Sequence, residues 1–145
     1  VYYLCILLGS FVLMLPLVIR WRGSADLLVK ILPAIAVMVV GFLVLAWSPT
    51  LMLFVMALLV FFVGFNYLEA TLPALVSKVA PSARRGSAMG VYSSSQFLGI
   101  FAGGSVGGVL IGLTDITTLL VVNAALLILW AGLLMALQRG SNQPK

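Results

Sequence analysis

Charged and titratable residues are scarce in this sequence. Only 8% of its 145 residues are charged, it has no histidine, and its single cysteine is Cys5. A lone cysteine cannot form an internal disulfide, and without histidine the chain lacks the most common metal ligand. Soluble domains carry about 25% charged residues to solvate their surface. These shortages exclude a cytosolic enzyme, a disordered tail and a disulfide scaffold, and no metal or cofactor is expected.

The residues that are abundant are apolar. Hydrophobic residues make up 63% of the chain, and the mean hydropathy is +1.27. They form continuous runs without alternation, which indicates membrane-spanning helices, because a helix satisfies its own backbone hydrogen bonds in lipid. The sequence predicts an all-α, polytopic helical membrane protein. Its bundle covers 1–139, with five transmembrane helices at about 1–19, 31–47, 51–76, 87–112 and 117–137, and a short cytoplasmic tail follows at 140–145.

The positions of the basic residues predict the orientation. The net charge is +5, but the eight Lys and Arg are scattered and form no basic face for nucleic acid. They lie in the first loop, the third loop and the tail, at Arg20, Arg22, Lys30, Lys78, Arg84, Arg85, Arg139 and Lys145. The only charge in the other two turns is Asp115. Since basic loops stay inside, we expect a multi-pass protein of the inner or plasma membrane with these loops in the cytoplasm.

This orientation places Val1 on the outer side, at the start of an apolar segment that has no Met before it. We therefore expect further segments upstream, so that the chain is the C-terminal part of a larger protein. The alternative is a signal peptide over 1–19. That alternative is disfavoured because the segment has neither a basic flank nor a small-residue cleavage site.

Glu69 is the only acidic residue predicted at membrane depth. It lies about 14 Å along the helix from Lys78, too deep to reach water at low cost. Asn66 and Pro73 share its helical face, and Pro73 frees the carbonyl of residue 69 and is expected to kink the helix. One hypothesis is a binding site for a proton or cation. In the other, Glu69 pairs with a cytoplasmic-side Lys or Arg and only holds helices together.

Further polar residues are predicted in the membrane. Asn66 and Gln96 should both lie about 15 Å from the cytoplasmic ends of their helices, which suggests a shared cavity. Tyr92 lies one turn from Gln96, and Tyr67 and Asn123 are further candidates for a substrate or proton pathway. The alternative for each is an interhelical hydrogen bond, the more common role of a polar residue in a membrane bundle.

The fourth segment is dense in glycine, and two stripes run along it at a spacing of four residues. We expect helix packing to depend on these glycines of the segment: Gly90, Gly99, Gly103, Gly104, Gly107, Gly108 and Gly112. A face almost without side chains predicts that a neighbouring helix approaches closely. A further hypothesis is that such a smooth face lets two bundles rock against each other. A nucleotide loop is excluded, since no strand precedes these glycines.

The stretch Gly90-VYSSSQFL-Gly99-IFA-Gly103-Gly104-SV-Gly107-Gly108 resembles the antiporter pattern G-x8-G-x3-G-P-x2-G-G of the major facilitator superfamily. Gly104 stands where that pattern has Pro. The preceding residues, from Phe65 on, are similar to the region between the tenth and eleventh helices of that family, most of all in YajR-type proton-driven efflux transporters. The first loop lacks the spacing of the family's gating loop, so Asp26 receives no gating role.

The resemblance implies that the five segments are helices eight to twelve of a twelve-helix fold. It also implies proton-coupled export of small, drug-like molecules by alternating access, together with an N-terminal half that this chain lacks. The expected partners are a small-molecule substrate, protons, the lipid bilayer and that missing half. Two alternatives stay open: an importer of sugars or organic anions, and a non-transport five-helix subunit. An enzyme is not expected, because no nucleophile–base pair or metal-ligand set is present.

Overall fold

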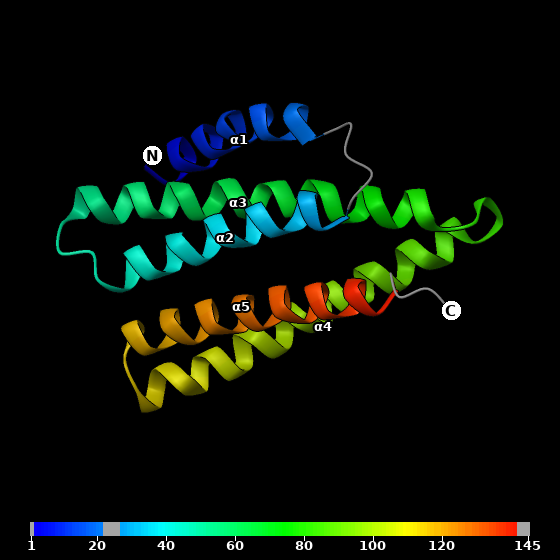
Figure 1. Ribbon diagram of the computed structural model, residues 1–145. Coiled ribbons are helices and arrows are strands. Elements are labelled where there is room, and N and C mark those ends of the chain that lie inside the picture. Colours follow the sequence, from blue (N-terminus) through cyan, green and yellow to red (C-terminus); the bar gives the residue numbers. More distant parts are fainter. Residues whose placement is uncertain (1, 22–26, 142–145) are drawn as a thin grey trace.

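The computed structural model describes residues 2–21 and 27–141, and within these ranges the chain contains helices and no strand. The long helices are α1 (Tyr2–Trp21), α2 (Leu27–Ala46), α3 (Leu51–Val79), α4 (Arg85–Leu113) and α5 (Ile116–Ser141), with a short 3-10 turn, η1 (Ser82–Arg84), before α4. Successive helices run in opposite directions beside one another (Figure 1). The predicted all-α fold with five long helices is confirmed.

Four of the helical stretches are long and apolar enough to cross a membrane: Leu27–Ala46, Leu51–Val79, Ser82–Leu113 and Ile116–Arg139. The apolar stretch of α1 is shorter, Ile6–Arg20. Within the described residues, length and composition thus support four of the five predicted spans, and α1 is itself a helix of 20 residues.

The helix ends differ from the prediction where basic residues occur. Lys30 was predicted in a loop but lies in the first turn of α2, and Lys78 lies in the last turn of α3. A long Lys side chain can continue a helix because its aliphatic stem packs on apolar neighbours while its ammonium group reaches the polar region. Of the predicted tail 140–145, Gly140 and Ser141 belong to α5. Arg22, Asp26, Lys145 and Val1 lie outside the described residues.

Short polar residues begin two of the helices. Thr50 accepts a hydrogen bond at Oγ1 from the backbone N–H of Leu53, at 3.3 Å, and so caps α3. Asp115 accepts one at Oδ1 from the backbone N–H of Thr118, at 2.8 Å, and caps α5. Each cap satisfies a backbone donor that the first turn of a helix leaves unpaired. Both turns can therefore be short, and successive helices are antiparallel.

The cap at Asp115 makes a pH-dependent contribution to stability. Hydrogen bonds from the Thr118 hydroxyl and backbone hold the pKa of Asp115 below its ordinary value of 3.8. Because the folded state has the lower pKa, the contribution is present above pH 3.8 and is lost as the pH falls below it. We expect Asp115→Ala to lower the unfolding temperature slightly at neutral pH, and this difference from the wild type to close in acid. Asp115→Asn, which can still cap, should keep most of the stability.

The core lies between α1, α2, α3 and α5. Ile35 of α2 is 1% exposed and shares a buried cluster with Met14 of α1 and with Tyr67 and Leu68 of α3, and Trp130 of α5 packs against this cluster. None of the residues of α4 is buried. Large apolar side chains, such as Phe97 and Phe101 on α4, are exposed instead. The molecule is therefore a four-helix core with α4 beside it, and its apolar outer surface is suited to lipid or to further protein.

α2 and α3 approach each other closely at two glycines that the sequence analysis did not single out. A Cβ at Gly64 would lie 2.7 Å from the carbonyl oxygen of Ala34 and 2.7 Å from Cγ of Met38. A Cβ at Gly41 would lie 2.8 Å from Cβ of Phe61. Small residues that let two backbones approach are typical of membrane helix pairs. These two glycines fix the distance between α2 and α3.

The glycine face of α4, in contrast, is open within this chain. No helix of this chain packs closely on it: nothing lies within 4 Å of a Cβ built at Gly90, Gly99, Gly103, Gly104 or Gly108, so the predicted close packing stays a prediction. Gly107 meets only Cδ1 of Leu119, at 3.7 Å. The reason is that α4 diverges from α3 along its length (Figure 1). Spacing alone predicted a smooth face correctly but did not reveal what covers it.

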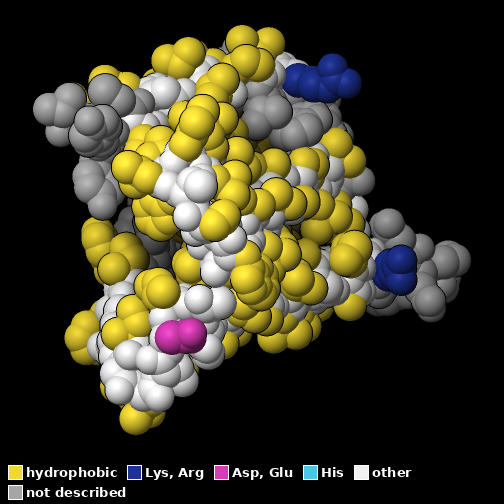
Figure 2. Space-filling model, turned by 90° about the vertical axis from the view of Figure 1, so that its left-hand side faces the viewer, with side chains coloured by type: hydrophobic (Ala, Val, Ile, Leu, Met, Phe, Trp, Pro, Cys, Tyr) yellow, Lys and Arg dark blue, Asp and Glu magenta, His cyan; other side chains and the backbone are white. Residues whose placement is uncertain are grey.

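The two ends of the bundle differ in charge. The last turn of α1, the first turn of α2 and the turn between α3 and α4 lie at one end, together with the end of α5 (Figure 1). The Ser48–Thr50 and Thr114–Asp115 turns lie at the other, where the Thr117 hydroxyl donates to the carbonyl of Ala46 at 3.4 Å. Figure 2 looks at this second end, where hydrophobic side chains dominate, acidic atoms appear, and Lys and Arg lie only at the edge. We call the first end the basic end.

Candidate functional site

A cavity of about 880 Å³ lies between α3 and α4. The two helices form its sides, with Phe65, Leu68, Glu69 and Leu72 on α3 and Tyr92, Ser95, Gln96, Gly99 and Ile100 on α4. Met38 of α2 and Trp130 of α5 complete the lining. The cavity exists because α4 diverges from α3, and its volume is that of a pocket for a small molecule. We call it the α3–α4 cavity.

Glu69 and Gln96 meet across this cavity. Nε2 of Gln96 donates a hydrogen bond to Oε1 of Glu69 at 2.7 Å, a length typical of a bond to a charged acceptor. The two residues lie on different helices, and each projects from its own wall. Glu69 is thus paired with a neutral amide rather than with a Lys or Arg. Its remaining carboxylate oxygen can accept a proton or a further hydrogen bond from a molecule in the cavity.

The rest of the lining is mostly apolar and aromatic. The hydroxyl of Ser95 donates to the carbonyl of Val91 in its own helix, at 2.9 Å. Tyr92 and Trp130 place aromatic rings in the wall together with Phe65. A few polar groups in an otherwise apolar wall are typical of a site that binds a small amphipathic molecule. The aromatic faces also favour a positively charged group.

A second cavity, of about 580 Å³, adjoins the first toward the basic end. Leu72, Tyr92 and Trp130 line both cavities, and the second continues between Leu27 of α2 and Leu134 of α5. The two cavities therefore form one groove along α4. The sequence analysis named Tyr92 for this region but missed Trp130, because a tryptophan in an apolar helix cannot be told from a lipid-facing one by its position alone.

Asn66 lies away from the α3–α4 cavity. Its Nδ2 donates to Oγ of Ser10 in α1 at 2.9 Å, and that hydroxyl donates to the carbonyl of Leu7 at 2.9 Å. Ser10 is fully buried. This is an interhelical hydrogen bond between α1 and α3, the alternative that the sequence left open for each polar residue. Matching depth with Gln96 did not bring Asn66 into one cavity with it, because Asn66 contacts α1, whereas Gln96 approaches α3 from α4.

The remaining candidates are also placed elsewhere. Tyr67 is buried at 3% exposure and interacts with Thr71 on the α1–α2 side of α3. Asn123 donates from Nδ2 to the carbonyl of Leu119 in its own helix, at 2.8 Å. Pro73 lies one turn beyond Glu69, and α3 continues through it without a break. Of the predicted pathway residues, the structure brings together Glu69, Tyr92 and Gln96.

Comparison with known proteins connects this arrangement to transport. The chain is 50% identical over 70 residues to the inner membrane transport protein YajR of Escherichia coli K12, a match that covers 48% of this chain and 15% of the relative. An uncharacterized transporter of Buchnera aphidicola subsp. Baizongia pistaciae is 38% identical over 76 residues, which are 52% of this chain and 19% of that protein. The chain is related to membrane transporters.

The similarity spans less than a fifth of the length of these transporters. No protein-family profile matches the chain, and no solved structure matches it. The relatives' names and the four apolar helices support a membrane-embedded protein related to transporters. In a transporter, a carboxylate on a cavity wall within a membrane helix is a default candidate for an ion or substrate site.

Proposed function

We propose that this chain is part of a secondary transporter of the major facilitator type, which exports small amphipathic molecules in exchange for protons. The observation that carries the proposal is the Glu69 carboxylate, held by Gln96 on the wall of an apolar and aromatic cavity of about 880 Å³. The transport proteins among its relatives support the transport role.

The chemistry of Glu69 explains how exchange would work. As a carboxylate it can hold a positively charged substrate, with the aromatic faces of Tyr92 and Trp130 adding attraction. Binding of a proton removes its negative charge and with it this attraction. Proton and substrate therefore compete for one group, so that each leaves when the other binds. Competition at a shared group couples their opposite movements when the site changes sides only while Glu69 holds a proton or a substrate.

Two further proposals complete this arrangement. The basic end of the bundle faces the cytoplasm, as the distribution of Lys and Arg favours. A second helical half, outside this chain, covers the open glycine face of α4 and closes the α3–α4 cavity alternately toward each side of the membrane. The exposed apolar side chains of α4, such as Phe97 and Phe101, are suited to such a covering.

The test is a transport assay with the complete protein in proteoliposomes under an imposed pH gradient. We expect lipophilic cations to move against their gradient while protons move the opposite way, and a protonophore to stop the movement. A neutral sugar should not be transported. Sugar uptake without cation movement would favour an importer, and the absence of any flux would favour a non-transport subunit. Either result contradicts the proposal.

A further inference from the structure

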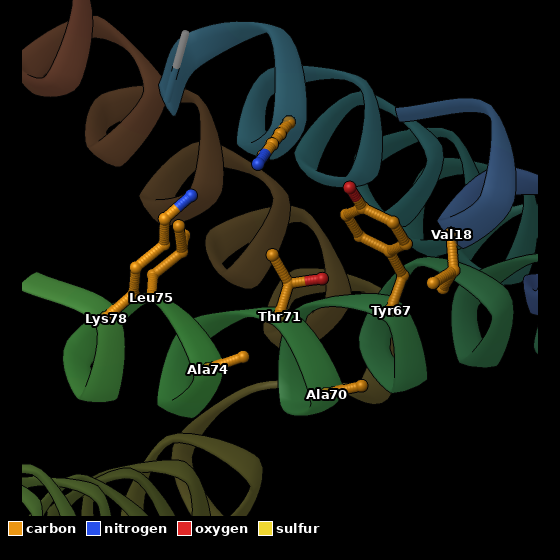
Figure 3. A pocket seen from close by; sticks show the side chains of 8 residues that line it. Val18, Tyr67, Ala70, Thr71, Ala74, Leu75 and Lys78 are labelled. Carbon is orange, nitrogen blue, oxygen red and sulfur yellow. The ribbon is translucent and has the colours of Figure 1, made fainter. Parts of the chain in front are cut away.

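A separate cavity of about 300 Å³ lies on the other side of α3, among α1, α2 and α3. Its lining includes Val18 of α1 and Lys30 of α2, and from α3 it takes Tyr67, Thr71, Leu75 and Lys78. Figure 3 shows the labelled side chains of α3 along successive turns, with Tyr67, Thr71, Leu75 and Lys78 extending toward α2. The cavity is on the face of α3 that holds Tyr67, away from Glu69, and the proposed transport site does not use it.

Two ammonium groups share this small cavity. Lys30 lies in the first turn of α2 and is partly buried, and Lys78 lies in the last turn of α3. Like charges that share a cavity repel each other, and an anion between them relieves that repulsion. Within the described residues, both acidic groups lie elsewhere: Glu69 pairs with Gln96, and Asp115 caps α5 at the opposite end. The two lysines therefore give the lining of this cavity a positive charge, which an anion would balance.

The rest of the lining indicates what kind of anion fits. Tyr67 and Thr71 contribute hydroxyl groups, which can donate hydrogen bonds to phosphate oxygens. Val18 and Leu75 are apolar, and so is the surface of the spanning helices around the opening. The cavity lies near the basic end of helices long enough to cross a bilayer, which is the level of lipid headgroups. An ion with an apolar tail matches this lining better than a fully hydrated one.

We propose that the cavity among α1, α2 and α3 binds the phosphate headgroup of an anionic phospholipid, with Lys30 and Lys78 on either side of the phosphate and the acyl chains along the outer surface of α1 and α3. Basic pockets between membrane helices bind such headgroups by charge and hydrogen bonding. The lipid would join α1 to α3 at the basic end, as the hydrogen bond between Ser10 and Asn66 joins them nearer the middle.

The test is native mass spectrometry of the complete protein in detergent, titrated with phosphatidylglycerol or with phosphatidylcholine. We expect the wild type to bind the anionic lipid preferentially. The double variant K30Q/K78Q should bind it roughly thirtyfold more weakly, since each Lys near an anionic lipid contributes about fivefold. The matched control is R84Q/R85Q, which removes two charges from the same end but outside the cavity, and it should bind as the wild type does.

A conservative variant separates binding from folding. K30R/K78R keeps both charges and should keep the preference for phosphatidylglycerol, while K30Q/K78Q should still elute as a folded protein. Equal loss of lipid binding in K30Q/K78Q and in R84Q/R85Q would overturn the proposal, because lipid binding would then depend on the general surface charge and not on this cavity. A second result would also overturn the proposal. If inorganic phosphate alone bound to the wild type, needed both lysines and prevented binding of the lipid, the anion of this cavity would be a soluble one.

Discussion

The complete protein with Glu69→Gln should fold and insert normally but no longer couple transport to protons. Glutamine has nearly the same shape as glutamate, and the cavity wall should keep its packing. The amide cannot take up or release a proton in the physiological pH range, so the exchange reaction lacks its coupling group. We expect substrate flux driven by a pH gradient to fall to the level of empty proteoliposomes, measured with the same lipophilic cation for both proteins.

Asp115→Asn is the matched control, because it neutralises the other described carboxylate, which lies outside the membrane-spanning stretches. This variant should transport as the wild type does. A Glu69→Gln protein that still transports at the wild-type rate, with the same response to a protonophore, would show that Glu69 is not the coupling residue. In that case the hydrogen bond with Gln96 would only hold α3 and α4 together.

Gly64→Val is expected to cause the largest loss of stability. Its Cβ would lie 2.7 Å from the backbone oxygen of Ala34, which cannot move without displacing α2. Overpacking of this kind costs about 1–3 kcal/mol and more where backbone is involved. We expect a lower yield of folded protein by size-exclusion chromatography and a clear decrease in unfolding temperature in detergent.

Gly132→Val in α5 is the control, because nothing lies within 4 Å of a Cβ at that position. It places the same residue in a membrane-spanning helix and should change the unfolding temperature little. If both variants were equally stable, α2 and α3 would not approach each other as closely as the structure has it.

The sequence alone was sufficient for the helices and for selecting Glu69 as a candidate residue. Continuous apolar runs determine helices wherever the solvent is lipid, and Glu69 could be recognised because a carboxylate is rare at that depth. Tyr92 and Gln96 were named as pathway candidates, but the contact between Gln96 and Glu69 was not predicted. The helix boundaries near Lys30 and Lys78 were wrong because the first charge was read as the end of the helix, although a long Lys side chain is compatible with a terminal turn.

Other features depend on which helices are neighbours, which spacing within one helix does not reveal. The dense glycines of α4 predicted close packing, yet the close approach occurs at the isolated Gly41 and Gly64. Asn66 shares a helical face with Glu69 by count, but its partner is Ser10 of α1. Depth and periodicity place a residue along a helix and around it, whereas its contacts follow from the rotation and crossing of the helices.

The position of Trp130 gives the protein a natural optical reporter. Its indole lines both the α3–α4 cavity and the adjoining cavity, so a molecule that enters either one changes the polarity around it. Trp47, at the end of the bundle away from the basic residues, is 65% exposed and lines neither of these cavities. With the other tryptophans replaced by phenylalanine, the emission wavelength of Trp130 would follow occupancy of the groove in real time, and the emission of Trp47 in a matched variant would serve as a reference.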